Sequence, residues 1–331
     1  MELLDVSLEE VSSAVAHISA IVSPPYLNAR LLMEQRINCD KFSGRIRTRL
    51  KGLDDALFGG IPFGVLTELV GPAGIGKTQL CLKMSLLAAL PERCGGMDGR
   101  VIYIDVESKF NSRRMIEIGA TSFPDIFKSK DMAREMAGRI LVLQPTSLSE
   151  FTESLQKIQL SIFQNQVTLL VIDSMTALSS GECIDISRKN HSLAWHISFL
   201  KSLAEFGRIP VLVTNQVRAQ NQHETSSYSF QAKQGTDGSI GVDHYESHLV
   251  AALGIHWSHA VTIRLVLEAK SGQRFIKIAK SPISPPICFP YTISSSGISL
   301  LDDEGIELRG TDITSISNSG KEAFINFDYS F

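Results

Sequence analysis

A glycine-rich segment combines the residue types that bind phosphate groups. Residues 71–78 read GPAGIGKT and lie between the apolar run VLTELV (65–70) and the helical run TQLCLKMSLLAAL (78–90). This spacing matches the phosphate-binding loop, in the strand–loop–helix context that the motif requires. Glycines let backbone N–H groups surround the phosphates, a lysine neutralises their charge, and a threonine hydroxyl binds Mg²⁺. The residues predicted to bind ATP with Mg²⁺ are Gly71, Pro72, Ala73, Gly74, Ile75, Gly76, Lys77, Thr78 and Gln79.

An acidic residue ends a second apolar run. VTLLVID (167–173) finishes on Asp173, the position expected for a carboxylate that holds Mg²⁺ through water from a neighbouring strand. Taken alone, such a residue is equally consistent with a turn at the end of a strand. Beside a complete phosphate loop, it completes a metal site, and we predict that Thr78 and Asp173 together hold the magnesium.

Hydrolysis also needs a carboxylate that orients or deprotonates the attacking water. Many motor ATPases place it directly after the magnesium-linked aspartate, but here Ser174 follows Asp173. Glu107 comes just after RVIYID (100–105), the first apolar run beyond the phosphate-loop helix, and is the candidate base. Asp105 is the alternative, and spacing alone does not exclude it.

A glutamine lies between a strand and a long polar segment. Gln216 follows the apolar run IPVLVTN (209–215) and precedes residues 218–247, which show no periodicity. A segment of this length in a compact domain is usually functional or disordered. We predict that Gln216 contacts the γ-phosphate and relays its presence into residues 218–247, with an ordinary strand-end cap as the alternative.

The order of apolar and helical runs predicts an α/β fold. The runs 65–70, 100–105, 139–143, 167–173 and 209–215 are typical of buried parallel strands whose sheet is covered by helices on both faces. AVTIRLVLEA (260–269), the turn KSGQ and RFIKIAK (274–280) instead predict an antiparallel hairpin at one edge of the sheet. Residues 1–36 read as helical, with apolar residues at helix spacing until Pro24 and Pro25 stop the run.

Composition limits the classes of function. The chain has 331 residues and a formal net charge of −3, so any DNA contact must be local. Its five cysteines never form a C-x-x-C pair, which is typical of reduced thiols in an intracellular compartment. No segment approaches the roughly 20 apolar residues of a membrane-spanning helix, so we expect no membrane partner.

One basic segment stands out near the N-terminus. Residues 41–51 (KFSGRIRTRLK) carry five basic and no acidic side chains. If they form a strand, Arg45, Arg47 and Arg49 share one face. A solvated edge strand or linker is the simpler interpretation, and a DNA-contacting or nuclear-import patch is the alternative.

Several motifs together resemble one protein family. GPAGIGKTQ, YIDVES with KF and NSRRM, LLVIDS and VTNQV resemble the RecA-type recombinases of eukaryotes and archaea, from about residue 47 to 300. RILVLQPTSL, AALGIHWSHAVTIRLVLE and IAKSPISPP are most similar to one eukaryotic paralogue in its plant form. The resemblance implies a RecA-like P-loop NTPase core (52–300) after a partial N-terminal helical domain (1–40) and the basic linker or strand (41–51), and before an acidic tail (301–331).

The resemblance also assigns roles to single residues. By motif position, Glu107 matches the water-activating glutamate, Asp173 the magnesium-linked aspartate and Gln216 the γ-phosphate sensor. Arg114 matches an arginine that lies against the adenine. With the phosphate-binding Lys77, the expected catalytic residues are Glu107, Lys77 and Gln216. The family's two DNA-binding loops correspond to residues 179–190 and 218–247, which adds Arg188, Lys189, Arg218 and Lys233 to the basic DNA-binding candidates.

The implied function is homologous-recombination repair in the nucleus. The resemblance implies a DNA-dependent ATPase that joins other paralogues, the C-type paralogue first, on single-stranded or branched DNA, and assists the main recombinase. Residues 218–247 hold two basic and four acidic side chains, which counts against strong phosphate binding. An ATP-stabilised assembly scaffold with negligible hydrolysis is therefore the alternative, and a RecA-fold ATPase unconnected with DNA is a third hypothesis.

Overall fold

The chain divides into two compact units, residues 1–44 and 45–331. The computed structural model describes residues 8–22, 28–39, 44–128, 130–180, 186–219, 249–251, 253–302 and 305–306. The first unit contains two helices, α1 (Leu8–Val22) and α2 (Ala29–Cys39), in the part predicted to be helical. Among the helices in these ranges, none has the length and apolar character needed to cross a bilayer.

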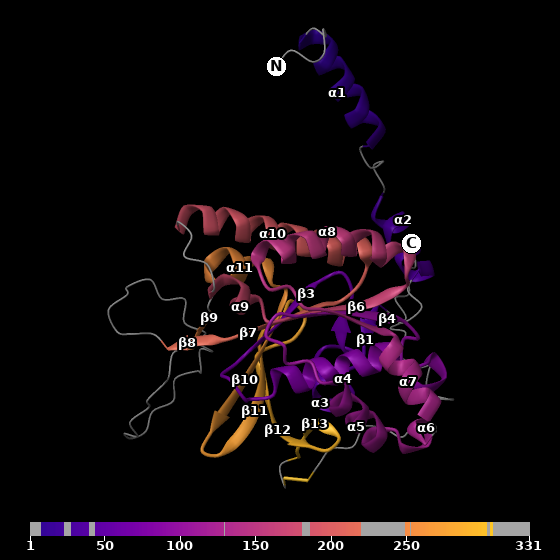
Figure 1. The fold of residues 1–331 in the computed structure, drawn as a ribbon, viewed down its shortest axis with the longest axis vertical. Coiled ribbons are helices and arrows are strands. Elements are labelled where there is room, and N and C mark those ends of the chain that lie inside the picture. Colours follow the sequence, from indigo (N-terminus) through magenta and orange to yellow (C-terminus); the bar gives the residue numbers. More distant parts are fainter. Residues whose placement is uncertain are drawn as a thin grey trace, which may run out of the picture. The chain divides into compact units, whose positions relative to one another are not determined.

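A nine-stranded sheet is the centre of the second unit (Figure 1). Its order is β13-β12-β11-β10-β3-β7-β6-β4-β5. The strands from β3 to β5 pair in parallel, and β10 is also parallel to β3. The five strands from β3 to β5 in this order correspond to the five predicted apolar runs, which confirms the predicted α/β fold. They are β3 (Leu66–Val70), β4 (Arg100–Asp105), β5 (Ile140–Leu143), β6 (Val167–Asp173) and β7 (Val211–Asn215).

The C-terminal part of the sheet is antiparallel. Strands β10 (Ile263–Lys270) and β11 (Gln273–Lys280) form the predicted hairpin. Its two-residue turn has positive φ at Ser271 (51°) and Gly272 (80°), as a tight turn matched to the strand twist requires. Two more antiparallel strands follow that the sequence did not predict, β12 (Ile287–Ser294) and β13 (Gly297–Leu300).

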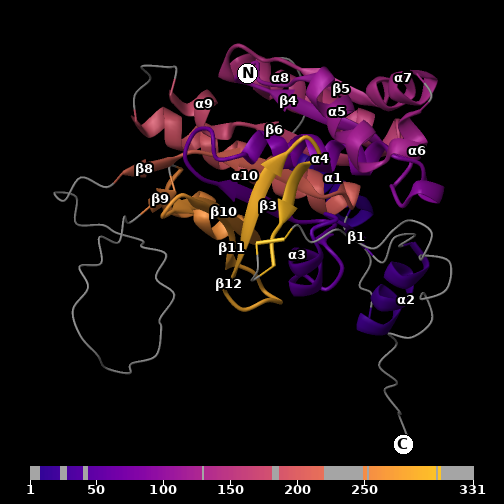
Figure 2. The same cartoon turned by 90° about the horizontal axis from the view of Figure 1, so that it is seen from below.

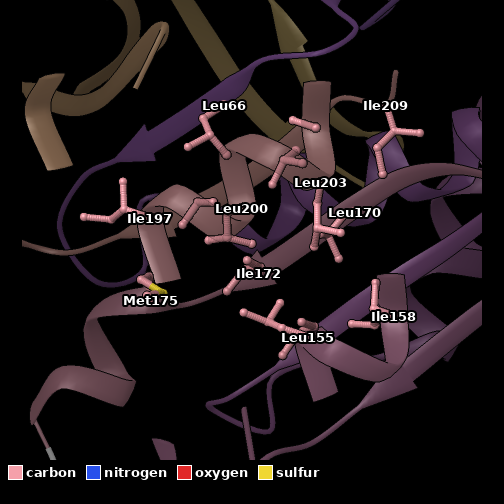
Figure 3. Close-up of a cluster of buried hydrophobic side chains, with 14 of the residues drawn as sticks. Leu66, Leu155, Ile158, Leu170, Ile172, Met175, Ile197, Leu200, Leu203 and Ile209 are labelled. Carbon is pink, nitrogen blue, oxygen red and sulfur yellow. The ribbon is translucent and has the colours of Figure 1, made fainter. Parts of the chain in front are cut away.

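Helices cover both faces of the sheet. Figure 1 shows α8, α10 and α11 on one face, with α4 on the other. A cluster of buried hydrophobic side chains joins α8 and α10 to strands β3, β4, β6 and β7. Figure 3 shows Leu155 of α8 and Leu200 of α10 with Leu170 of β6 in this cluster. The helices of the second unit are α3 (Lys51–Ala56), α4 (Lys77–Ala89), η1 (Glu92–Cys94), α5 (Ser112–Ser122), α6 (Pro124–Phe127), α7 (Lys130–Gly138), α8 (Leu148–Gln164), α9 (Met175–Ser180), α10 (Ile186–Gly207) and α11 (Gly254–Ala260).

Two short antiparallel pairs complete the unit. Strand β1 (Arg45–Ile46) pairs with β2 (Ile61–Pro62), and β8 (Val217–Ala219) pairs with β9 (Leu249–Ala251). Figures 1 and 2 both show β8 and β9 side by side, outside the nine-stranded sheet. The segment between them, residues 220–248, lies outside the described residues.

A buried carboxylate links four elements of this unit. Glu68 of β3 is fully buried, and its carboxylate forms an ion pair with Arg264 of β10 at 2.5 Å. The same carboxylate accepts hydrogen bonds at 2.6 Å from Trp257 Nε1 of α11 and from Asn215 Nδ2 of β7. Because an unpaired buried charge is costly, this cluster fixes how β3, β7, β10 and α11 meet.

We expect Arg264→Met to destabilise the protein strongly, because it leaves Glu68 charged and buried without its cation. Losing one partner of a buried ion pair typically costs about 3–5 kcal/mol. Urea denaturation would measure the loss. The double variant Glu68→Gln/Arg264→Met, which removes both charges, should recover part of that loss.

Lys51→Ala is the control, because Lys51 pairs with Asp55 on the surface at 3.7 Å with both side chains largely exposed. An exposed pair contributes at most about 1 kcal/mol. Equal losses for Lys51→Ala and Arg264→Met would refute the importance of the buried cluster.

Candidate active site

The phosphate-binding loop connects β3 to α4, as predicted. Gly76 has φ of 118°, and a Cβ at this position would lie 2.7 Å from the Ile293 side chain. A Cβ at Gly71 would lie 2.4 Å from the carbonyl oxygen of Leu267 in β10. Both positions therefore need glycine, the first for its backbone conformation and the second for the close approach of β10.

Lys77 begins α4 and points back into the loop. Its Nζ donates hydrogen bonds to the carbonyl oxygens of Gly71 at 2.7 Å and of Pro72 at 2.8 Å. Burial lowers the pKa of Lys77 from its usual value. The lysine is thus held among backbone groups at the position where the motif needs a cation for phosphate.

Asp173, at the end of β6, accepts hydrogen bonds from three hydroxyl groups. Thr78 Oγ1 donates to its Oδ2 at 2.7 Å and Tyr103 Oη donates to the same oxygen at 2.8 Å, while Thr214 Oγ1 donates to Oδ1 at 2.5 Å. The predicted metal pair, Thr78 and Asp173, is therefore in direct contact. A carboxylate beside a hydroxyl suits Mg²⁺, which prefers oxygen ligands and keeps several waters. Tyr103 and Thr214 were missed, although each is a polar residue in an otherwise apolar run.

The structure separates the two candidate bases. Asp105 is 1% exposed, and its carboxylate stabilises the turn after β4. It accepts hydrogen bonds from the backbone N–H groups of Lys109 at 2.8 Å and Phe110 at 2.9 Å, and from Gln144 Nε2 at 3.2 Å. Glu107 lies within that turn and lines the cavity beside the phosphate loop. The geometry therefore favours Glu107, and Asp105 positions the turn that carries it.

The carboxylate of Glu107 has partners on both oxygens. Ser174 Oγ donates to Oε1 at 2.5 Å, and the Lys109 ammonium pairs with Oε2. Burial raises the pKa of Glu107, but hydrogen bonds from Lys109 and Ser174 and the positive charge of Lys109 outweigh it, so the pKa falls below its usual value. Glu107 is therefore a carboxylate at neutral pH.

Gln216 follows β7 directly and lines the same cavity. Its backbone N–H donates to Thr176 Oγ1 at 3.3 Å, and its side chain hydrogen-bonds to Glu107. The next residue begins β8. Gln216 thus connects the predicted base to the strand that leads toward residues 220–248, which is the arrangement that the sensor hypothesis requires.

Arg114 lies at another wall of the cavity, near the start of α5. Its guanidinium donates to Gln79 Oε1 at 2.8 Å and to the carbonyl oxygens of Ser294 at 2.5 Å and Ser295 at 3.3 Å, and it pairs with Glu117 at 3.0 Å. These acceptors fix the guanidinium plane in place. A preorganised planar cation of this kind stacks well on an aromatic base.

The predicted residues converge on one cavity of about 550 Å³. This volume is within the range of small-molecule sites. Gly71, Pro72 and Ile75 contribute to the loop from outside it: the first two bind Lys77, and the Ile75 carbonyl accepts the Tyr291 hydroxyl at 2.7 Å. Lys109 and Ile293 were missed. The cavity is lined by Ala73, Gly74, Gly76, Lys77, Thr78, Gln79, Glu107, Lys109, Arg114, Asp173, Gln216 and Ile293.

The basic segment differs from its prediction. Of its described residues, only Arg45 and Ile46 form a strand, and Arg49 has φ of 59°, so an alternating strand through Arg49 is wrong. Arg45 donates to the carbonyl oxygens of Leu57 at 2.8 Å and Gly60 at 3.4 Å.

The other two arginines of this segment differ from each other. The Arg49 guanidinium donates to the Cys94 carbonyl oxygen at 3.3 Å and lies over the Phe123 ring. Arg47, by contrast, is exposed. Two of the three arginines considered as DNA contacts, Arg45 and Arg49, therefore bind backbone carbonyl groups of the protein itself.

The remaining DNA-binding candidates are placed only by their backbone. Arg188 and Lys189 lie in the first turns of α10, and Arg218 lies in β8. Their side chains and the whole of Lys233 are outside the described part of the chain. Their contact with DNA remains a prediction.

We expect Arg114→Ala to weaken the binding of ATP and ADP by a similar factor, about tenfold for a cation–π contact near 1–2 kcal/mol. The two nucleotides share the base that Arg114 is predicted to contact. Fluorescence titration with labelled nucleotides would measure both affinities. Arg113→Ala is the matched control, because Arg113 is exposed and does not line the cavity; a loss confined to ATP would contradict the prediction.

The sequence of the chain matches a known protein family. The family model Rad51 matches residues 43–301. "DNA repair protein RAD51 homolog 2" of Arabidopsis thaliana is 63% identical over 327 residues, covering 99% of this chain and 88% of that protein. The human protein of the same name is 33% identical over 317 residues, covering 91% and 80%. "DNA repair protein RAD51 homolog 3" of Cricetulus griseus is 28% identical over 269 residues, covering 77% and 68%.

These matches confirm the resemblance inferred from the motifs. Homolog 2 is the B paralogue of the eukaryotic recombinase, and the high identity to the Arabidopsis protein confirms the similarity to its plant form. The RecA-like fold with its antiparallel C-terminal strands agrees with the matched domain. Both the extent of the domain match and the identity to the relatives show that the chain belongs to the Rad51 family.

Proposed function

We propose that this protein is an ATP-binding and ATP-hydrolysing subunit of a complex of Rad51 paralogues that repairs DNA double-strand breaks by homologous recombination in the nucleus. The curated relatives carry DNA repair in their names. The observation that carries the proposal is the convergence of Lys77, Thr78, Asp173, Glu107 and Gln216 on one cavity. Each of these residues suits one role in phosphoryl transfer to water.

The roles follow from the contacts. Lys77 and the loop N–H groups bind the phosphates, and Thr78 with Asp173 would hold Mg²⁺, which neutralises charge on the terminal phosphates when bound. Glu107 orients the attacking water and accepts its proton. Gln216 contacts both this base and the strand leading to the predicted DNA-binding segment, so ATP binding and DNA binding are coupled through it.

The C-type paralogue is the proposed first partner, and single-stranded or branched DNA the proposed ligand. Arg45 and Arg49 are engaged within the chain, and the net charge is negative. Strong DNA binding by this chain alone is therefore not expected. The paralogue complex supplies the remaining cationic surface.

A scaffold role is the second candidate, and one observation favours it. Glu107 is paired with Lys109 and has a lowered pKa, which weakens it as a base. In that case ATP stabilises the interface between paralogues and its turnover is negligible. The two candidates differ in whether repair requires hydrolysis.

Glu107→Gln separates the two candidates. In the complex co-purified with the C-type paralogue, we expect it to lower DNA-stimulated ATP turnover by about 10²-fold or more while ATP affinity changes little, because it removes only the base. Lys77→Ala should abolish turnover by removing the phosphate cation. The exposed Glu153→Gln on α8 is the control and should match the wild type.

The two candidates are decided by measuring DNA repair in cells that lack the protein and are supplied with the Glu107→Gln variant. Loss of repair with Glu107→Gln, while the complex still assembles, supports the ATPase. Full repair and assembly with the same variant would refute it and leave the scaffold. A complex that binds ATP but shows no DNA affinity would count against a role in recombination.

A further inference from the structure

Lys109 is a cation in the cavity that neither the motif nor the proposed roles use. It lies two residues beyond Glu107, and its ammonium pairs with Glu107 Oε2. Its backbone N–H donates to Asp105 Oδ1 at 2.8 Å, so the turn that positions the glutamate also positions the lysine. The Lys109 side chain is half-exposed, whereas that of Glu107 is 17% exposed. Lys109 therefore reaches the carboxylate from the solvent side of the cavity.

The charges that line the cavity explain why this cation matters. Lys77, Lys109 and Arg114 face Glu107 and Asp173. Lys77 donates hydrogen bonds to the phosphate loop, and Arg114 donates to Gln79 and to the carbonyl oxygen of Ser294 at the end of β12. Among the cavity-lining residues that the structure describes, Lys109 is the cation that forms an ion pair with Glu107.

A base positioned for attack at the third phosphate creates an electrostatic conflict. The carboxylate must lie near the terminal phosphate, and two anions at short range repel each other. ADP lacks that phosphate and meets less of this repulsion. A cation fixed on the carboxylate reduces the conflict for ATP more than for ADP.

We propose that Lys109 is a positioning residue that acts through Glu107: by pairing with this carboxylate it reduces repulsion of the third phosphate and so favours ATP over ADP. This inference rests on the proposed function, because it assumes that the cavity binds ATP with its terminal phosphate near Glu107. An ordinary exposed ion pair would instead have little effect on binding.

The test compares affinities for a non-hydrolysable ATP analogue and for ADP, both with Mg²⁺, in the full chain with its C-type partner. We expect Lys109→Met to weaken binding of the analogue about tenfold and that of ADP less than about twofold. The variant restores repulsion between Glu107 and the third phosphate, which ADP lacks. Lys109→Arg keeps the charge and should retain the preference for the analogue. Lys128→Met is the control, since Lys128 pairs with Asp125 on the surface and does not line the cavity.

A second background shows whether Lys109 acts through Glu107. In Glu107→Gln, which has no charge to neutralise, Lys109→Met should cost less than about twofold for either nucleotide. A tenfold loss that persists in this background would overturn the proposal, because Lys109 would then act on phosphate directly. Equal losses for both nucleotides, or no loss at all, would overturn it as well. If the wild type binds neither nucleotide, the proposed function fails first; if it binds both and Lys109→Met changes nothing, only this inference fails.

Discussion

The buried charge of Glu68 is the constraint on which the arrangement of the site depends. Glu68 lies on β3, the strand that leads into the phosphate loop, and burying its carboxylate without partners would be costly. Arg264, Trp257 and Asn215 supply those donors from three other elements. The phosphate loop, the end of β7 and the helix after β9 are therefore positioned by one carboxylate.

Two aspartates at neighbouring strand ends show how local partners divide the chemistry. Asp105 and Asp173 are in register on β4 and β6, and both are almost fully buried. Backbone N–H groups and an amide occupy Asp105, so it organises a turn. Hydroxyl groups surround Asp173, one of them from the phosphate loop's own threonine, which leaves an oxygen-rich corner suited to a hard cation.

The sequence predicted the parts of this site that follow from local order along the chain. Residues 71–78 between a strand and a helix, and Asp173 at a strand end, were found because each motif carries its own context. Spacing alone left Asp105 and Glu107 open, since the first ends β4 and the second lies only two residues beyond it; the resemblance favoured Glu107, and the fold of the turn separates the two.

What the sequence could not predict depends on partners that are distant along the chain. Arg45 and Arg49 looked available for DNA because the carbonyl oxygens that bind them come from residues further along. Strand β12 was missed because Pro290 lies inside it, and proline is uncommon within strands. Lys109 carried no signal, since a lysine in a polar turn is ordinary until the carboxylate beside it is placed in the cavity.

The anchoring of β7 and α11 on Glu68 has a consequence for the evolution of the chain. Asn215 precedes β8 and Trp257 follows β9, so both ends of the intervening sequence are attached to the same buried residue. Insertions and deletions between β8 and β9 therefore leave Gln216 and the phosphate loop in place. The length and composition of that stretch can therefore vary more freely in evolution than the site residues beside it.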